Sequence, residues 1–410
     1  MTELPLDGVT ILDLSRLLPG PFCSLLLADF GADVIKIEDT GMGDYVRWSP
    51  PYYEGAAETA KSALFLALNR GKRSVRINLK ADAGKEVLLR LVAGADVLIE
   101  SFRPGVLDRL GVGYERLREV NPGLVYCAIS GYGQDGPNRD RSGHDLNYLG
   151  LNGILGLTGD RDGPPVQAAA QIADIGGGSL MAAVGILMAL RERERSGTGQ
   201  LVDCSMFDGA LSWLGMVAAE AFATGRGARR GELPLAGRFV CYRPYACADG
   251  HVSLGALEPK FWAAWCEGVG RPELVPNQFE APGSETHQAV QAIFLERTRE
   301  EWRAFASGHD CCLEPILELD EVLDSELVRA REMVVAIDQP GVSEPVRQLG
   351  APIKLSRTPA DTGRAPGPEL GEHTDQVLAG AGFSEAEIAE LHEAGAIAGS
   401  AEAAHGSFLS

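Results

Sequence analysis

The chain lacks an excess of positive charge and lacks a long hydrophobic run. Its 410 residues include 37 Lys and Arg against 57 Asp and Glu, which gives a net charge of −20. A protein that binds nucleic acid presents a net basic face to the phosphates, so this balance argues against a nucleic-acid partner. The longest apolar stretch with helical character, residues 180–190, is too short to cross a bilayer. We therefore expect no membrane partner.

Zinc motifs and targeting signals are missing as well. The eight cysteines form no Cys-x-x-Cys pair and no Cys/His zinc spacing, which is typical of buried thiols in a reducing compartment. The N-terminal residues show no basic segment followed by an apolar one, so they predict no signal peptide. We expect a cytoplasmic protein that uses no metal.

The common nucleotide-binding fingerprints are absent too. After the first predicted strand the chain reads Arg-Leu-Leu-Pro-Gly-Pro over residues 16–21, without a Gly-x-Gly-x-x-Gly motif, and no P-loop is present. These absences weaken any assignment as a dehydrogenase or kinase.

What the first two hundred residues do show is an alternation of strand and helix patterns. Strands are predicted at 9–14, 34–37, 75–79, 96–100, 124–129 and 200–204, and helices at 21–30, 83–92, 174–194 and 207–222. This order predicts an α/β fold with a mostly parallel, doubly wound sheet.

The composition changes after this region. The stretch 225–237 is rich in Gly and Arg and is predicted to be a linker, and residues 239–257 are predicted to form a hairpin. Helical patterns follow to about residue 331, and strand character returns at 334–337. We predict a large domain over 1–225, a small α+β domain over 226–330, and a C-terminal part over 331–410 whose end, after Gly395, is frayed.

Two candidate bases stand out. His144 lies in the run Gly-His-Asp-Leu-Asn-Tyr over residues 143–148, and Asp174 follows thirty residues later, just before three glycines at 176–178. An imidazole and a carboxylate beside exposed backbone N–H groups suit proton removal and return next to a carbonyl group, and the glycines would allow a close approach. The alternatives are that Asp174 is only a helix N-cap and that His144 is an ordinary turn residue.

Arginines form a second candidate set. Arg73 stands near the start of a predicted strand, and Arg103 and Arg109 follow the strand that ends at Glu100. Ligands of doubly wound sheets bind at the carboxyl ends of the strands, so Arg103 and Arg109 are candidate clamps for a phosphate. The alternative is that they are solvated surface side chains.

The chain resembles the class III CoA-transferase superfamily (the CaiB/BaiF group), and within it the α-methylacyl-CoA racemases. The matching segments occur in order along nearly all of the chain, at 19–23, 27–34, 70–74, 96–106, 129–137, 143–148, 174–178, 197–200, 248–250, 255–261 and 370–375. The resemblance implies a large domain built from both chain ends, a small domain, and two subunits that interlock into a homodimer.

The resemblance also implies roles for individual residues. The aspartate matching Asp174 is the nucleophile in the transferases and a proton-transfer base in the racemases, where it works with the histidine matching His144. Asp145 and Glu258 match acidic residues around the racemase site, and Glu258 is expected to orient His144. We expect the acyl-CoA to be bound by four basic residues, Lys36, Arg73, Arg103 and Arg109, and by two residues of the histidine motif, Gly143 and Tyr148.

Two departures from the racemase pattern are visible. Asp39 stands where racemases often have a basic residue, and the segment 41–61 is longer than expected. The full set nevertheless predicts a racemase or epimerase acting at C2 of a 2-methyl-branched acyl-CoA, with coenzyme A as part of the substrate and no metal or prosthetic group. A CoA-transferase that uses Asp174 as nucleophile is the first alternative, and a catalytically silent acyl-CoA-binding or scaffold protein is the second.

Overall fold

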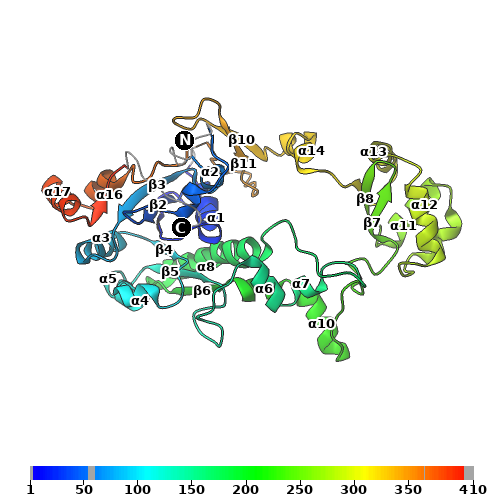
Figure 1. The fold of residues 1–410 in the computed structure, drawn as a ribbon, viewed down its shortest axis with the longest axis horizontal. Helices are drawn as coiled ribbons and strands as arrows, with labels where there is room; N and C mark the ends of the chain where they lie inside the picture. Colours follow the sequence, from blue (N-terminus) through cyan, green and yellow to red (C-terminus); the bar gives the residue numbers. More distant parts are fainter. Residues whose placement is uncertain (1–2, 54–60, 364, 401–410) are drawn as a thin grey trace. The chain divides into compact units, whose positions relative to one another are not determined.

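The computed structural model describes residues 3–53, 61–363 and 365–400. They form two compact units, shown in Figure 1. Unit 1 comprises residues 1–152, 170–212 and 327–410, and unit 2 comprises residues 153–169 and 213–326. Residues 153–169 and 213–225, which the sequence placed in the large domain, thus belong to the smaller unit.

Unit 1 contains a seven-stranded sheet in the order β12-β3-β2-β1-β4-β5-β6. All neighbouring strands run parallel except β12, which pairs antiparallel with β3. The bounds are β1 Thr10–Asp13, β2 Asp33–Glu38, β3 Lys72–Ile77, β4 Val97–Glu100, β5 Val125–Ser130, β6 Leu201–Ser205 and β12 Ile397–Ala398. The predicted α/β class and its mostly parallel sheet are confirmed.

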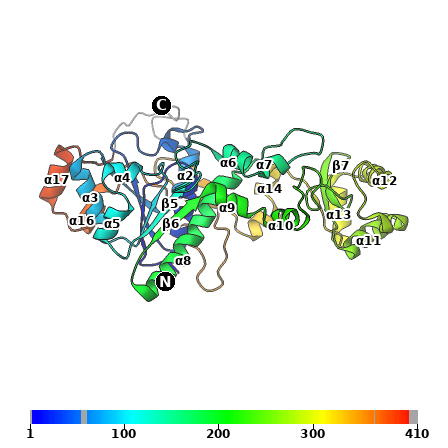
Figure 2. The same cartoon turned by 90° about the horizontal axis from the view of Figure 1, so that it is seen from below.

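Both faces of this sheet are covered by helices. On one face, alternate strand residues such as Leu12, Ile35 and Leu98 share a core with helices α3, α4, α5, α16 and α17. On the other face, the intervening residues such as Ile11 and Val34 are equally buried. Helices α1 and α8 lie on that face (Figure 2). Burial on both sides explains why these strands read as continuous apolar runs. The helices of unit 1 are α1 Pro19–Ala28, α2 Ala63–Asn69, α3 Asp82–Val92, α4 Val106–Leu110, α5 Tyr114–Val120, α6 Asp145–Leu151, α8 Met181–Ser196, α9 Met206–Ser212, α16 Thr374–Gly380 and α17 Glu385–Glu393.

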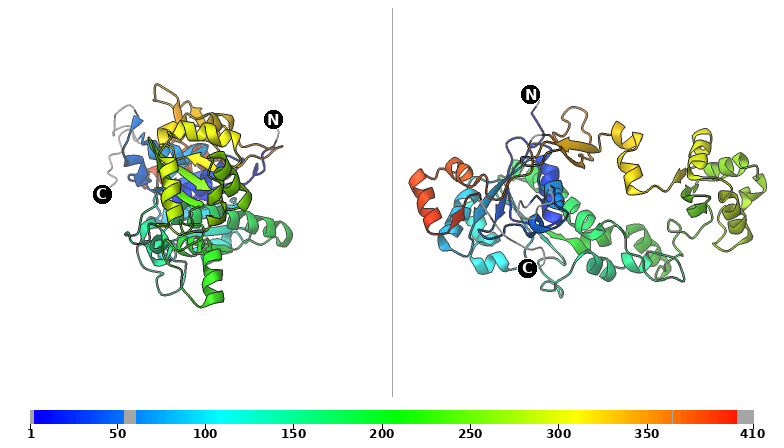
Figure 3. Two further views of the ribbon diagram at one scale, coloured as in Figure 1. Left: turned by 90° about the vertical axis from the view of Figure 1, so that its right-hand side faces the viewer. Right: turned by 45° about the horizontal axis from the view of Figure 1, so that its top comes forward.

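Segments from both ends of the chain meet in unit 1, as the blue and red ribbons in Figure 3 show. The 3₁₀ turn η1, Tyr45–Trp48, follows β2, and the hairpin β10 Val334–Ile337 and β11 Val346–Leu349 forms a separate two-stranded sheet.

Unit 2 is built around aromatic side chains. A three-stranded antiparallel sheet, β7 Tyr242–Cys247, β8 Gly250–Gly255 and β9 Leu313–Pro315, packs with helices over a core that includes Trp262, Trp265, Phe294 and Trp302. The predicted hairpin is therefore present. The other elements from residue 153 to 330 are α7 Ile154–Leu157, α10 Gly215–Thr224, α11 Pro259–Gly268, η5 Pro272–Asn277, α12 Glu285–Phe294, α13 Arg299–Gly308, α14 Leu319–Leu323 and, across the boundary with unit 1, α15 Glu326–Ala330.

Four local predictions were wrong. The third strand begins at Lys72 rather than Val75, so Arg73 lies inside it. The helix predicted over 174–194 opens with a π-helical segment, η4 Ile172–Leu180, before α8, and the helix predicted over 207–222 is broken between α9 and α10. The end after Gly395 is not frayed throughout, because Ile397 and Ala398 form β12.

The helical stretch from Ile172 to Ser196 is longer than the apolar run that the sequence analysis considered. Its 25 residues include a window with a mean hydropathy of 1.7, which is long and apolar enough to cross a membrane by length and composition alone. Half of that window is buried inside the structure, and a core helix of a soluble protein passes the same test.

Candidate active site

A pocket of about 630 Å³ opens in unit 1 at the carboxyl ends of the central strands. It is lined by residues that follow β1, β4 and β5, including Leu17, Phe102 and Gly131. The chain winds in opposite directions from β1 and β4, which are neighbours in the sheet, and such a switch point leaves a crevice for a ligand. His144 and Asp174 both line this pocket. The structure therefore brings together the two candidate bases that the sequence singled out.

His144 stands at the start of α6, in a turn that its neighbours fix. Its backbone N–H donates to Oδ1 of Asn147 at 3.0 Å, and the Tyr148 hydroxyl donates to the carbonyl of Gly143 at 2.6 Å. A Cβ on Gly143 would come within 2.7 Å of the Tyr148 ring and 3.0 Å of the Tyr132 hydroxyl. Gly143 and Tyr148 line the pocket, and their own contacts hold the turn that presents His144.

Asp145 supports the backbone at Asp174 directly. Its Oδ1 accepts hydrogen bonds from the backbone N–H groups of Ala173 at 2.6 Å and Asp174 at 3.1 Å. It therefore caps the N-terminal end of η4 from another helix. The next N–H group, of Ile175, donates to the carbonyl of Gln171 at 3.0 Å.

These surroundings shift the acidity of Asp174. Burial, reinforced by the negative charge of Asp145 and opposed by His144, raises the pKa of Asp174 from 3.8 to about 6. A carboxyl group of that pKa exchanges its proton near neutral pH, as an acid–base catalyst must.

The glycines after Asp174 serve packing. A Cβ on Gly177 would lie 2.5 Å from the carbonyl oxygen of Met206 and 2.7 Å from the nitrogen of Ala210, and a Cβ on Gly209 would lie 2.1 Å from the carbonyl oxygen of Gly177. These glycines let η4 and α9 approach backbone to backbone. The expectation that the start of this helix offers exposed N–H groups to a ligand is wrong for residues 173–175, because their N–H groups are already bonded.

Guanidinium groups form another part of the pocket wall. Arg103 lines it, together with Arg16, Arg139 and Arg141. Arg16 pairs with Asp39 at 2.9 Å, so the acidic residue that departs from the racemase pattern is matched by a nearby cation. The excess of positive charge suits an anionic ligand such as a phosphate group.

Several predicted residues lie elsewhere. Lys36 is fully buried and ion-paired with Asp44 at 2.9 Å, and Arg73 pairs with Asp33 beside a different pocket. Arg109 does not line the pocket that contains His144. It lies near the pocket residue Arg139, because a Cβ added to Gly105 would be 3.3 Å from Nη1 of Arg109 and 3.1 Å from Nη2 of Arg139. Glu258 is an exposed residue at the start of α11 in unit 2.

Two further residues near the pocket escaped the sequence analysis. Tyr45 lines the pocket from η1, in the segment 41–61 that was expected to be longer than in the racemases and of which residues 54–60 lie outside the described part of the chain. Glu100, at the end of β4, accepts a hydrogen bond from the N–H of the pocket residue Phe102 at 2.7 Å, and burial raises the pKa of Glu100 to about 8. The only sequence signal for Glu100 was its position at the end of a central strand, and no local pattern marked Tyr45.

No group of three His, Cys, Asp or Glu side chains within residues 3–53, 61–363 and 365–400 could hold a metal ion.

The fold and the pocket define an α/β enzyme with a polar site at the switch point of its sheet. A family model described as CoA-transferase family III matches residues 6–374, and the chain belongs to this family. It is 39% identical over 394 residues to the α-methylacyl-CoA racemase of Mus musculus, covering 94% of this chain and 96% of the relative.

Transferases are similar over the same length. The chain is 35% identical over 390 residues to the succinyl-CoA:mesaconate CoA-transferase of Haloarcula hispanica, covering 92% of this chain and 96% of the relative. The crystal structure of a CaiB/BaiF family protein from Brucella suis superposes with a TM-score of 0.80 at 32% identity, covering 93% of this chain and all of that one.

Proposed function

We propose that the protein is a racemase or epimerase that moves the C2 proton of a 2-methyl-branched acyl-CoA. The observation that carries this proposal is that two proton-transfer groups, His144 and Asp174, line one pocket. A transferase that forms a covalent intermediate needs only the carboxylate. The similarity to racemases over nearly the whole chain supports the same assignment.

The two groups would act on opposite faces of C2. One removes the proton while the other, already protonated, returns a proton to the other face, and the roles exchange in the reverse direction. An imidazole gains and loses protons near neutral pH, and the raised pKa of Asp174, about 6, brings the carboxyl group into the same range. Asp145 would position Asp174 by bonding the backbone N–H groups at its helix start.

Deuterium uptake from D2O tests this proposal. Each pure C2 epimer of a 2-methylacyl-CoA is incubated with the protein without an acceptor acid. We expect deuterium at C2 and conversion to the other epimer. His144→Ala should abolish racemisation and confine exchange to the epimer that presents its proton to Asp174, whereas Asp174→Ala should confine exchange to the other epimer. Normal racemisation by His144→Ala, together with an adduct trapped on Asp174, would contradict the two-base assignment.

A CoA-transferase is the second candidate, favoured by the match to a transferase over 92% of the chain. Asp174 would then attack the thioester, and CoA would move to a free carboxylic acid. This activity requires an acceptor acid, so omission of the acceptor separates the two reactions.

The remaining assignments are part of the proposal. Arg103 would bind CoA phosphates, with Arg16, Arg139 and Arg141 as further cations of the pocket, and Glu258 would orient His144 across subunits of a cytoplasmic homodimer. Large apolar side chains exposed on α8 and α10, such as Met188 at 67% and Phe222 at 86%, support an interface. Sedimentation combined with activity at the same dilution tests the dimer, and a fully active monomer would contradict it.

A further inference from the structure

Removal of the C2 proton places negative charge on the thioester oxygen. The electron pair of the broken C–H bond moves toward the carbonyl, and the developing enolate oxygen needs hydrogen-bond donors. The backbone N–H groups at the start of η4 lie beside Asp174, but those of Ala173 and Asp174 donate to Asp145 and that of Ile175 donates to Gln171. These three groups are therefore already engaged, and a side-chain donor elsewhere in the pocket is an alternative source of the hydrogen bond.

Tyr45 is placed to supply that donor. It lines the same pocket as His144 and Asp174. Burial and the negative charges of Asp44 and Asp174 raise the pKa of Tyr45, against the opposing effect of Arg16, so the phenol keeps its proton at neutral pH.

Buried ion pairs hold Tyr45 in this place. The preceding residue, Asp44, is paired with Lys36 at 2.9 Å, accepts a hydrogen bond from the N–H of Val46 at 3.1 Å, and donates its own N–H to Glu38 at 2.9 Å. Both Asp44 and Lys36 are fully buried. The residue before Tyr45 is thus fixed to β2.

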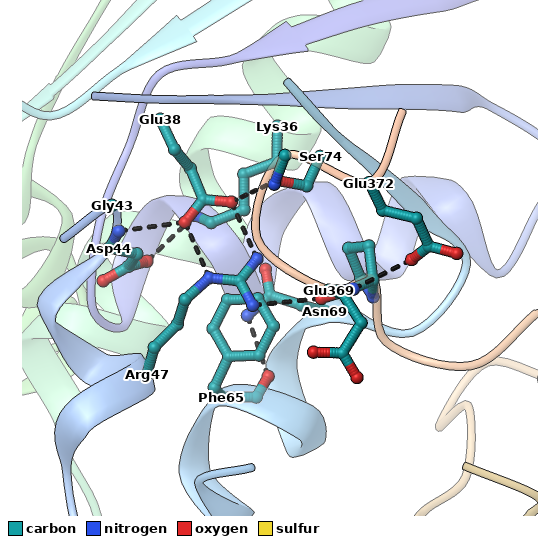
Figure 4. A network of polar contacts seen from close by, with 12 residues as sticks. Lys36, Glu38, Gly43, Asp44, Arg47, Phe65, Asn69, Ser74, Glu369 and Glu372 are labelled. Carbon is teal, nitrogen blue, oxygen red and sulfur yellow. Dashed lines mark hydrogen bonds and ion pairs between the residues drawn. The ribbon is translucent and has the colours of Figure 1, made fainter. Parts of the chain in front are cut away.

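Arg47, two residues after Tyr45, is anchored as firmly. Its guanidinium group donates to both carboxylate oxygens of Glu38, at 2.8 and 2.7 Å, and to the carbonyl of Pro368 at 3.0 Å (Figure 4). It also lies over the ring of Phe65, 3.6 Å from the centroid. With Asp44 on one side and Arg47 on the other, η1 has little freedom to move Tyr45 away from the pocket.

We infer that Tyr45 is a further catalytic residue, whose hydroxyl donates a hydrogen bond to the thioester oxygen as that oxygen becomes an enolate oxygen. The phenol keeps its proton throughout, because the C2 proton passes to and from the two bases. This role rests on the proposed function.

Tyr45→Phe tests the inference, because it removes only the hydroxyl. The loss of one such donor typically lowers kcat on the order of 10²–10³-fold. The enolate oxygen is common to both directions of the reaction. Deuterium exchange should therefore fall by the same factor from both epimers, with little change in KM, whereas replacement of either base affects the epimers unequally. Tyr114→Phe, on α5 and outside the pocket, is the matched control.

The outcomes separate this inference from the proposed function. Exchange by the unaltered protein, with equal exchange by Tyr45→Phe, overturns the role of Tyr45 and leaves the racemase intact. A fall for one epimer alone also overturns it, since that pattern marks a base. If the unaltered protein exchanges no deuterium but transfers CoA to an acceptor acid, the proposed function fails. Tyr45 is then tested in the transfer reaction, where an unchanged kcat in Tyr45→Phe overturns its role as a donor to the thioester oxygen.

Discussion

Replacing Asp145 by Asn should make Asp174 more acidic without removing the hydrogen bonds that cap its helix. An amide oxygen at position 145 can still accept the N–H groups of Ala173 and Asp174, but it carries no charge. Since the charge of Asp145 raises the pKa of Asp174, Asp145→Asn should lower that pKa.

The size of the effect follows from the causes of the shift. The rise in the pKa of Asp174 from 3.8 to about 6 corresponds to about 3 kcal/mol of free energy between its charged and neutral forms. Burial is the largest cause and the charge of Asp145 the second, so removal of that charge should lower the pKa of Asp174 without returning it to 3.8. We expect a pKa lower by roughly one unit, or about 1.4 kcal/mol.

The assay is the pH dependence of deuterium uptake from the epimer whose proton Asp174 removes. The carboxylate is the active form, so uptake should rise with pH through about 6 in the unaltered protein, and this rise should move to lower pH in Asp145→Asn. Asp145→Ala is the comparison, because it also removes the acceptor and should lower the free energy of unfolding by about 1.5–3 kcal/mol. An unmoved pH profile in Asp145→Asn would refute the electrostatic role.

Four further results are expected. In steady-state kinetics, Arg103→Ala should raise KM for the acyl-CoA by about 10–100-fold with kcat nearly unchanged, because phosphate contacts are equal in the ground and transition states. The control is Arg73→Ala, beside the other pocket, which should leave KM unaltered. Gly177→Ala should lower the free energy of unfolding by about 1–3 kcal/mol in thermal denaturation, because its methyl group has no room between η4 and α9, and equal stability would contradict the packing role. Arg47→Met should lower the free energy of unfolding by about 3–5 kcal/mol, since it leaves the buried Glu38 carboxylate without its main partner. Because Arg47 holds the pKa of Glu38 at about 2, the stability from this carboxylate should be lost as pH falls from 4.5 through 2 in the unaltered protein, and Glu38→Gln should lack this dependence.

The sheet was predictable from the sequence because its strands are buried on both faces. Runs such as Val-Leu-Ile-Glu at 97–100 carry no polar alternation, and their order between helical segments indicates parallel pairing. The π-helical opening of η4 was not predictable, because a π turn and an α turn share nearly the same apolar pattern. Neither was β12, since two residues give no periodicity.

The candidate site shows a similar division. His144 and Asp174 were singled out by the Gly-His-Asp run and the glycine-rich turn, and Arg103 by its place after a strand, and the structure places all three on one pocket. Lys36 was misjudged because a lysine inside a strand can point into the core, where Asp44 neutralises it. Tyr45 was missed because its place depends on buried contacts with β2 and Pro368, and no local pattern encodes contacts between distant segments.

The antiparallel pairing of β12 with β3 has a consequence for synthesis on the ribosome. Ile77 pairs with Ile397, so the last residues of β3 lack their partner strand until some 320 further residues have been translated, which takes roughly 16–64 seconds at 5–20 residues per second. During that time the nascent chain presents the unpaired N–H and C=O groups of a parallel sheet, the kind of edge that recruits strands from other chains. A premature stop codon just before residue 397 would therefore leave every residue of the candidate pocket in place and still leave the end of β3, at Arg76 and Ile77, without its partner strand.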